Sequence, residues 1–359
     1  MKALVLSGGE GTRLRPFTYS MAKQLVPVAN RPVLEHCLEN LRNIGVEETG
    51  IVVGGHGAQV EAAIGDGARF GMRITYIRQE APLGLAHCVS LASGFLGGDD
   101  FVMYLGDNVL ADGIAEAAET FRRRRPDAQI LVTKVADPRQ YGVAEIGADD
   151  TVRALVEKPQ EPRSDLAVIG VYFFTAAVHE AVRSIVPSAR GELEITDALQ
   201  HMIDHGRTVT AQVYGGYWKD TGRIDDLLEC NRALLGRLGT DRPEDGTGGD
   251  VDADSVVEGR VVVEPGARVI RSRLTGPVVI GAGSVVRDSR VGPYVAVGRD
   301  CVLDTAGVED SILLEGASIT DVPDLHSCVI GRWARVRAQG ESSHNRLIIG
   351  DHTQAEVLA

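Results

Sequence analysis

Short apolar runs alternate with amphipathic stretches over the first two thirds of the chain. The apolar runs have the length and the Val, Ile and Leu content of strands that are buried on both faces. They cover residues 3–6, 50–53, 74–77, 101–105, 130–135, 168–174 and 209–214. Apolar positions with helical spacing cover residues 33–44, 58–64, 85–95, 114–122, 193–205 and a stretch that begins at 224. This alternation predicts an α/β fold with a Rossmann-like mixed, mostly parallel sheet and helices on both faces.

Apolar residues recur every five or six positions in the last third of the chain, with small residues and glycines between them. They are Val263, Val269, Leu274, Ile280, Val286, Val291, Val297, Val302, Val308, Leu313 and Ile319. Neither the alternation of a half-buried strand nor the period of a helix produces this spacing. It is typical of a parallel β-helix, in which every sixth side chain points into a narrow core. A β-sandwich of short strands is the alternative.

The two patterns are separated by residues 239–254, which hold no bulky apolar residue except Val251. Gly, Asp and Pro clusters of this kind mark loops. A chain of 359 residues also exceeds what one hydrophobic core usually organises. We therefore predict a first domain over residues 1–238, a linker at 239–254, a β-helix over 255–345 and a C-terminal tail at 346–359.

Composition narrows the classes of partner. The formal net charge is −13 and there is no long block of Lys or Arg beyond residues 122–125, which argues against nucleic-acid binding. No apolar run approaches the ~20 residues of a membrane span, and a strand begins directly after Met1, so we expect a cytoplasmic protein without membrane contact. Five widely spaced cysteines without a CxxC pair predict reduced thiols and no zinc site. The partners should be small molecules.

A glycine-rich loop, residues 7–11, follows the first strand directly. Glycines allow backbone N–H groups to approach a phosphate or a base closely, and the cations Arg13 and Lys23 could flank a polyphosphate. Ligands of such sheets bind beyond the carboxyl ends of the strands, where this loop and residues 106–108 both lie. The loop matches neither the Rossmann fingerprint nor the Walker loop. It predicts a nucleotide site of another type, with a plain strand-to-helix turn as the alternative.

Two aspartates and one glutamine have side chains suited to the rest of such a site. Asp107 and Asp220 each lie where a strand-like run meets a turn. Mg²⁺ prefers a few carboxylates and keeps several waters, so this pair suits it, although aspartate there is also a common turn or cap residue. The amide of Gln79 can both donate to and accept from the O4 and N3 edge of a pyrimidine. None of the histidines stands in a nucleophilic pattern, and His87 is predicted to be packed in a helix.

Motifs along the chain resemble the sugar-phosphate nucleotidyltransferases. They are GGEGTRLRPFTYSMAKQ at 8–24, QEAPLGLAH at 79–87, LGDN at 105–108, EKP at 157–159, RGELEITD at 190–197 and WKDTG at 218–222. The segment 276–298 is similar to the left-handed β-helix that the long forms of this family carry. The resemblance implies transfer of a thymidylyl group from dTTP to α-D-glucose 1-phosphate by Mg²⁺-assisted in-line attack, with release of pyrophosphate. A homo-oligomer is also expected, because the ends of a β-helix need cover.

The resemblance also implies roles for individual residues. Arg13, Lys23 and Asp107 are the implied catalytic residues, and Asp107 and Asp220 the implied metal ligands. The implied nucleotide-binding residues are Leu6, Ser7, Gly8, Gly9, Gly11, Thr12, Gln24, Gln79, Pro82 and Gly84. The implied residues for the sugar phosphate are Leu85, Asn108, Tyr141, Gly142, Glu157, Lys158, Val168 and Arg190. In this assignment Glu157 contacts a sugar hydroxyl, whereas Lys158 and Arg190 contact the phosphate.

Several alternatives remain at this stage. The same chemistry could use UTP, N-acetylglucosamine 1-phosphate or mannose 1-phosphate, because one pocket contact changes affinity by only ~1–3 kcal/mol. The tail could be an acyltransferase, with His326 or His344 as a base. A catalytically inactive regulatory subunit is a third possibility, but it should lack the charged motif residues that this chain has.

Overall fold

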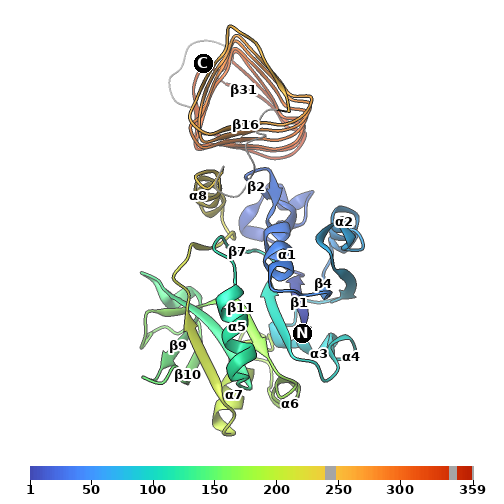
Figure 1. Ribbon diagram of the computed structural model, residues 1–359, viewed down its shortest axis with the longest axis vertical. Coiled ribbons are helices and arrows are strands. Elements are labelled where there is room, and N and C mark those ends of the chain that lie inside the picture. The colour runs from blue at the N-terminus through green and yellow to red at the C-terminus, as the bar shows by residue number, and fades with distance from the viewer. Residues whose placement is uncertain (239–247, 339–345, 358–359) are drawn as a thin grey trace. The chain divides into compact units, whose positions relative to one another are not determined.

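The computed structural model describes residues 1–238, 248–338 and 346–357, and the chain forms two compact units (Figure 1). The sheet unit consists of Met1–Glu10 and Leu34–Asp220. The β-helix unit consists of Gly11–Val33 and Thr221–Ala359. The chain therefore leaves the first unit after the start of the glycine loop and returns 23 residues later, a division that a contiguous domain over residues 1–238 does not anticipate.

A mixed sheet forms the centre of the sheet unit, with the order β10-β9-β11-β6-β1-β4-β5; β8 pairs with β11, and β12 with β8. β1 is parallel to β4 and β6, β4 to β5, and β8 to β12, whereas the pairs of β11 and the pair β9-β10 are antiparallel. The strands are β1 (Lys2–Ser7), β4 (Glu48–Val53), β5 (Arg73–Arg78), β6 (Phe101–Leu105), β8 (Ala128–Lys134), β9 (Gly142–Ile146), β10 (Val152–Glu157), β11 (Leu166–Phe174) and β12 (Val209–Val213). A short separate pair joins β7 (Asn108–Leu110) to β13 (Trp218–Asp220).

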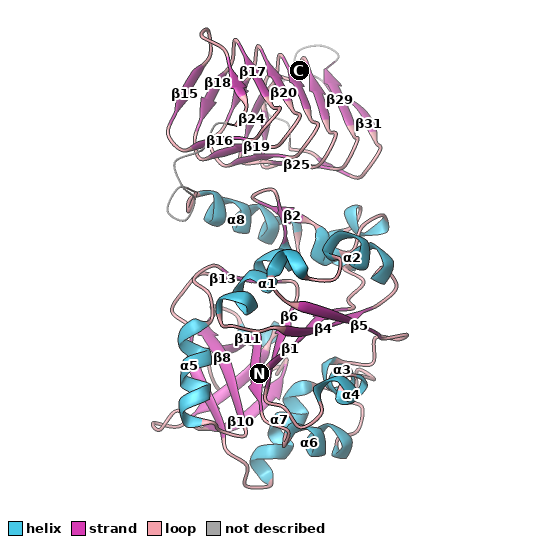
Figure 2. Cartoon of the chain, turned by 45° about the vertical axis from the view of Figure 1, so that its right-hand side comes forward, coloured by secondary structure: helices cyan, strands magenta, loops and turns pink. Residues whose placement is uncertain are grey.

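Helices cover both faces of this sheet (Figure 2). On one face, apolar side chains of α3, α6 and α7 form a continuous core with strand residues such as Leu4 and Phe101. On the other face, Phe121 of α5 stacks on Phe173 of β11 with ring centroids 5.4 Å apart, and Asn40 of α1 donates to the Tyr104 hydroxyl at 3.2 Å. The helices are α1 (Val33–Asn43), α2 (Gly57–Ile64), α3 (Leu85–Leu91), α4 (Ser93–Leu96), α5 (Ala115–Arg124), α6 (Val178–Ser184) and α7 (Ile195–Asp204). Among the described residues, no helix is long and apolar enough to cross a bilayer.

The last third of the chain forms a parallel β-helix whose coils stack with a triangular cross-section (Figure 1). Its three ladders are β14-β17-β20-β23-β26-β29-β31, β15-β18-β21-β24-β27 and β16-β19-β22-β25-β28-β30, as far as the chain is described. All residues of the predicted five- or six-residue pattern point into one buried core, except Val302, which is 41% exposed. This is the left-handed β-helix that the spacing and the resemblance predict, and not a sandwich. The neighbour of Val302, Leu303, takes the inward position in place of it.

The strands of the β-helix extend past the predicted 255–345 on both sides. β14 (Asp250–Val251) lies in the predicted linker, and β30 (Ile348–Ile349) and β31 (Gln354–Val357) lie in the predicted tail. The strands between them are β15 (Val256–Glu258), β16 (Val261–Val263), β17 (Arg268–Ile270), β18 (Arg273–Thr275), β19 (Val278–Ile280), β20 (Val285–Arg287), β21 (Arg290–Val291), β22 (Val295–Val297), β23 (Val302–Asp304), β24 (Gly307–Glu309), β25 (Ile312–Leu313), β26 (Ser318–Thr320), β27 (Leu325–His326), β28 (Val329–Ile330) and β29 (Arg335–Ala338).

The early segment Gly11–Val33 packs on this β-helix together with α8 (Ile224–Leu235). The amide of Asn30 donates to the Val297 carbonyl at 2.6 Å, and the Ala29 N–H donates to Asn231 Oδ1 at 2.9 Å. The segment also contains the short hairpin β2 (Pro27–Val28) and β3 (Arg31–Pro32). Motif residues from the start of the chain are therefore part of the β-helix unit.

Candidate active site

The carboxyl ends of β1 and β4 bring two glycines into close contact. Ser7 pairs with Val53, and a Cβ placed on Gly54 would lie 2.7 Å from the Gly8 carbonyl oxygen. A Cβ on Gly8 would lie 3.2 Å from Gln79 Oε1. Within the described residues, the buried hydroxyl of Ser7 has no hydrogen-bond partner. The loop thus combines a closely packed backbone with a buried hydroxyl that has no partner among the described residues, whereas Gly9 is exposed.

The amide of Gln79 is held in one orientation. Its Nε2 donates to the Gly84 carbonyl at 3.4 Å and lies 3.0 Å from Nδ1 of His87 on α3. Because an amide nitrogen only donates, His87 Nδ1 is the acceptor in this contact. Gln79 Oε1, on the Gly8 side, therefore presents a hydrogen-bond acceptor. The sequence predicted that His87 is packed in a helix, but it did not predict the contact between His87 and Gln79.

Gly84 joins the loop that follows Gln79 to a second motif, RGELEITD at residues 190–197. It has φ 104° and ψ 170°, and a Cβ there would lie 2.4 Å from the carbonyl oxygen of Leu193 and 2.6 Å from its nitrogen. The Leu193 N–H donates to the Leu83 carbonyl at 2.8 Å, and the Leu193 carbonyl accepts from Ala86 N–H at 3.0 Å. The predicted residues Pro82 and Leu85 flank this junction, the first exposed and the second half-buried.

The two aspartates come from neighbouring strands. Asp107 precedes β7, and β7 pairs with β13 so that Asn108 stands opposite Asp220. Asn108 Nδ2 donates to Asp107 Oδ1 at 2.9 Å, and Trp218 Nε1 donates to Asn108 Oδ1 at 2.7 Å. Within the described parts of the chain there is no group of three or more His, Cys, Asp or Glu that could hold a metal. A carboxylate pair fits Mg²⁺, which takes its other ligands from water and phosphate.

Charged residues of two further motifs meet around Glu157. Its Oε1 accepts from Arg190 Nη1 at 3.3 Å and lies 3.4 Å from Lys158 Nζ, and its Oε2 accepts from Thr196 Oγ1 at 3.3 Å. A Cβ on Gly142 would lie 3.3 Å from Glu157 Oε2. Lys158 and Arg190, from two separate motifs, therefore meet at one carboxylate.

Arg190 is surrounded by acids. Besides Glu157, its guanidinium contacts Glu192 at 3.2 Å and Glu194 at 3.5 Å. Glu194 is only 4% exposed, and burial raises its pKa despite a hydrogen bond from Ser188. Its carboxylate is thus a fixed partner for the half-exposed guanidinium. Glu194 was not among the predicted site residues, although it lies inside the RGELEITD motif.

An aromatic pair connects this cluster to the aspartates. The rings of Tyr141 and Trp218 meet edge to face with centroids 5.5 Å apart. The Tyr141 carbonyl accepts from Lys158 N–H at 3.0 Å, while Trp218 bonds Asn108 as described. The predicted Val168 is buried on β11, next to β9. Trp218 was not predicted individually, but its place two residues before Asp220 in WKDTG was the available signal.

The remaining predicted residues belong to the β-helix unit: Gly11, Thr12, Arg13, Lys23 and Gln24. Gly11 has φ 64°, and a Cβ there would lie 2.9 Å from Lys23 Cβ and 2.9 Å from Thr18 Cγ2. The Thr18 hydroxyl donates to the Gly11 carbonyl at 2.8 Å. Lys23 and Gln24 are buried, whereas Arg13 is exposed on the turn η1 (Thr12–Leu14). Gly11 and Lys23 are thus fixed against each other, and the exposed guanidinium lies on the adjoining turn.

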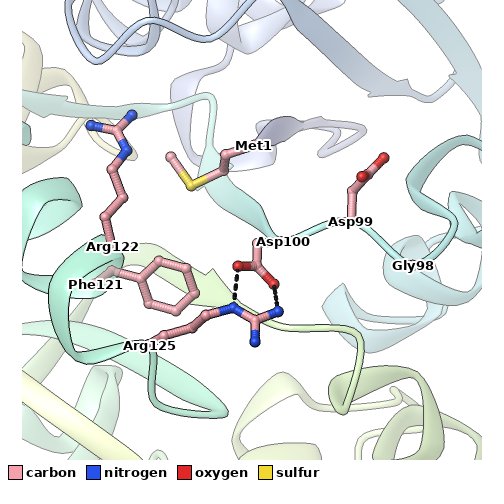
Figure 3. A pocket seen from close by; sticks show the side chains of 7 residues that line it. All are labelled: Met1, Gly98, Asp99, Asp100, Phe121, Arg122 and Arg125. Carbon is pink, nitrogen blue, oxygen red and sulfur yellow. Dashed lines mark hydrogen bonds and ion pairs between the residues drawn. The ribbon is translucent and has the colours of Figure 1, made fainter.

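A pocket of about 440 Å³ lies at the amino-terminal ends of β1 and β6, away from the strand ends described above (Figure 3). It is lined by Met1, Gly98, Asp99, Asp100, Phe121, Arg122 and Arg125. Asp100 accepts two hydrogen bonds from Arg125, at 2.9 and 3.0 Å. This pocket contains none of the predicted site residues, and ligands of parallel sheets bind at the carboxyl ends of the strands.

Comparisons with known proteins show the family to which the chain belongs. The nucleotidyl transferase family model matches residues 2–237. A glucose-1-phosphate thymidylyltransferase of Streptomyces griseus is 52% identical over 358 residues, which is 99% of each chain. The low-salt glycan biosynthesis nucleotidyltransferase Agl11 of Haloferax volcanii is 39% identical over 99% of this chain and 100% of its own length. A solved Bacillus anthracis structure assigned as a glucose-1-phosphate thymidylyltransferase has a TM-score of 0.61 and 36% identity, and covers 65% of this chain and 94% of that one.

Proposed function

Because the chain belongs to the nucleotidyl transferase family, and to its glucose-1-phosphate thymidylyltransferases by 52% identity over nearly its whole length, we propose that it makes dTDP-glucose from dTTP and α-D-glucose 1-phosphate. A phosphate oxygen of the sugar 1-phosphate attacks the α-phosphorus of dTTP, and the bond to the leaving pyrophosphate breaks. Three sets of contacts among the motif residues carry the proposal. The Gln79 amide contacts His87, Trp218 and Asn108 bond in a chain to Asp107, and Lys158 and Arg190 both contact Glu157.

Gln79 supports the choice of a thymine or uracil base. With its Nε2 engaged by His87 and Gly84, its Oε1 is the atom available to a base. In a pose that places N3 of the base against this oxygen, thymine and uracil donate their N3 proton, whereas N3 of cytosine is itself an acceptor and only the neighbouring N4 amino group of cytosine can donate. The fixed amide should therefore favour dTTP or UTP over dCTP.

Asp107 and Asp220 are the proposed ligands of Mg²⁺. When bound, this ion would offset the negative charge of the phosphates. Asn108 and Trp218 orient the first carboxylate through the hydrogen-bond chain from Trp218 to Asp107. These contacts hold the acceptor atoms before any ion arrives, which reduces the reorganisation needed on binding.

The cluster around Glu157 is the proposed site for the sugar phosphate. Lys158 and Arg190 supply positive charge, and both are now paired with carboxylates, so an incoming phosphate replaces contacts that are already formed. Once released from these pairs, Glu157 can accept from a sugar hydroxyl. Arg13 and Lys23, from the β-helix unit, are the proposed contacts of the triphosphate and of the departing pyrophosphate. Such transfer needs positioning and charge stabilisation rather than a nucleophilic side chain.

Two further parts of the proposal concern location and assembly. All five cysteines lie in the described residues and none forms a disulfide, as expected for a reducing, cytoplasmic compartment. A homo-oligomer is proposed because the first strand of one ladder, Val256–Glu258, has exposed side chains, with Val256 and Val257 40% and 45% exposed. An acyltransferase tail has less support: His326 is exposed on the β-helix, and His344 lies outside the described residues.

A substrate panel tests the proposal. The full-length protein is assayed for pyrophosphate release with dTTP, UTP and dCTP, each combined with glucose, N-acetylglucosamine or mannose 1-phosphate. We expect the highest kcat/KM with dTTP and glucose 1-phosphate and very little activity with dCTP. A preference for another sugar phosphate would replace glucose in the assignment, and the differently named relative at 39% identity makes this comparison necessary.

Variants assign the residues within the same assay. Asp107→Asn and Asp220→Asn should each nearly abolish turnover without changing the fold, and the losses should not add, because both act on one ion. Asp288→Asn, on an exposed corner of the β-helix, is the control for removal of a carboxylate. Wild-type turnover by both site variants at saturating Mg²⁺ would remove the metal assignment.

A further inference from the structure

The final coils of the β-helix bind the middle of the glycine-loop motif. Asp351 accepts from Arg332 Nε at 2.7 Å and Nη2 at 2.6 Å, and its side chain is only 4% exposed. The same carboxylate accepts from the Ser20 hydroxyl at 2.7 Å, and Arg332 Nη2 also donates to the Ser20 carbonyl at 3.2 Å. An ion pair between this buried carboxylate and the Arg332 guanidinium, whose side chain is 32% exposed, thus contacts both the side chain and the backbone of a residue 331 positions earlier in the chain.

The neighbouring backbone is also closely packed. A Cβ on Gly350 would lie 3.1 Å from Pro16 Cβ, so the last coil approaches the motif at a second point. The Arg332 N–H donates to Asp351 Oδ1 at 2.7 Å, which fixes the carboxylate on the β-helix itself. Both oxygens of Asp351 are therefore used: Oδ1 accepts from the Arg332 backbone, and Oδ2 accepts from both the Arg332 guanidinium and the Ser20 hydroxyl.

Ser20 is close in sequence to the residues proposed to contact phosphate. Its N–H donates to the Phe17 carbonyl at 3.2 Å and ends the turn η2 (Phe17–Tyr19). Thr18 of that turn bonds Gly11, and Gly11 packs on Lys23, three residues beyond Ser20. The turn held by Asp351 is thus the same turn that fixes Gly11 against Lys23.

We propose that Asp351, oriented by Arg332, is a positioning residue for the transfer reaction: the C-terminal coils of the β-helix hold the turn 17–20 so that Lys23 and Arg13 are kept in their working arrangement. The inference rests on the proposed phosphate contacts of these two cations. The ion pair between Arg271 and Asp288 of the β-helix is more exposed. Its two hydrogen bonds are 2.8 and 2.6 Å long, and its side chains are 52% and 40% exposed.

The test compares Asp351→Asn, Ser20→Ala and the double variant in the full-length protein, with Asp288→Asn as the matched control. Loss of a charge-assisted hydrogen bond from a buried site predicts a kcat lower by about 10- to 100-fold for Asp351→Asn. The KM for glucose 1-phosphate should stay near the wild-type value, because its proposed contacts lie in the sheet unit. The double variant should be little worse than Asp351→Asn alone, since both changes remove one contact. Asp288→Asn should turn over like the wild type.

Turnover is expressed per folded molecule, with the folded fraction taken from circular dichroism, so that loss of fold is separated from loss of positioning. The inference is overturned if Asp351→Asn lowers only the melting temperature while its folded molecules keep the wild-type kcat. It is also overturned if the effects of Asp351→Asn and Ser20→Ala add fully. Lys23→Ala separates a failure of this inference from a failure of the proposed function. Wild-type turnover in Lys23→Ala would remove the proposed phosphate role of Lys23, whatever the result with Asp351→Asn.

Discussion

Gly84→Ala should break the junction between the base loop and the sugar-phosphate motif. Gly84 lies at φ 104° and ψ 170°, a region of backbone conformation that is essentially restricted to glycine. The added methyl group would lie 2.4 Å from the Leu193 carbonyl oxygen and 2.6 Å from its nitrogen. Both atoms are backbone and both are hydrogen-bonded, so neither can move aside as a flexible side chain would.

Two terms set the expected size of the effect. Holding alanine in this conformation costs roughly 1–3 kcal/mol. Overpacking against fixed backbone costs roughly another 1–3 kcal/mol. The free energy of unfolding of the sheet unit should therefore fall by about 2–6 kcal/mol, a large part of the roughly 5–15 kcal/mol that stabilises a typical domain. If the loop shifts instead to relieve the clash, the base contact is displaced and the KM for dTTP rises.

The assay follows urea unfolding of the sheet unit by the fluorescence of Trp218. The second tryptophan, Trp333, lies in the β-helix unit, so a Trp333→Phe background makes the signal specific. Gly94→Ala is the control, because a Cβ there meets no atom within 4 Å and the site is in a helix. That control should be neutral or stabilising by up to about 1 kcal/mol. A Gly84→Ala protein with the stability of the control and an unchanged KM for dTTP would refute the reasoning.

Three further predictions concern charge and thiol chemistry. Lys158→Ala should raise the KM for glucose 1-phosphate by about 10- to 150-fold and leave that for dTTP unchanged, as steady-state kinetics will show; equal effects on both substrates would contradict the assignment. Burial, and then the charge of Glu157, raise the pKa of Asp197, so its ionised form destabilises the fold. Asp197→Asn should consequently be stabilising in urea melts at pH 7, and this gain should disappear below the ordinary carboxyl pKa of about 3.9. Burial raises the pKa of Cys88 and of Cys301 to about 12, so a thiol reagent at pH 8 should label both only after unfolding, and rapid labelling of the native protein would argue against that burial.

The parts of the fold that follow from sequence are those with strong local patterns. The buried strands β1, β4 and β6 are continuous apolar runs, and the β-helix repeats its inward residues at a spacing that no other regular structure has. β9 and β10 were not predicted, because GVAEI and VRALVE mix apolar and charged residues over a short length. The helix predicted over residues 85–95 is divided into α3 and α4 at Ala92, and Gly94, two residues further on, is a sequence signal for this break that the prediction did not use.

The site divides in the same way. Motif residues such as Asp107 and Glu157 could be named from the sequence because their neighbours along the chain form the motif. Their roles remain predictions, although the structure brings several of them into contact. The contacts of His87 with Gln79 and of Asp351 with Ser20 could not be predicted, because each depends on how separate segments fold together. A pattern within one segment carries no information about its partner in another.

The backbone bonds between Leu83, Leu193 and Ala86 have a consequence for how substrates are bound. They make the loop that carries Gln79 and the segment that carries Arg190 one hydrogen-bonded piece of the sheet unit. The proposed base contact and the proposed sugar-phosphate contact are therefore fixed relative to each other. The cations Arg13 and Lys23, in contrast, belong to the unit that contains the β-helix. Substitutions in the β-helix should accordingly lower kcat, through the proposed triphosphate contacts, more than they raise the KM for the sugar phosphate. A β-helix with no part in the reaction would change neither.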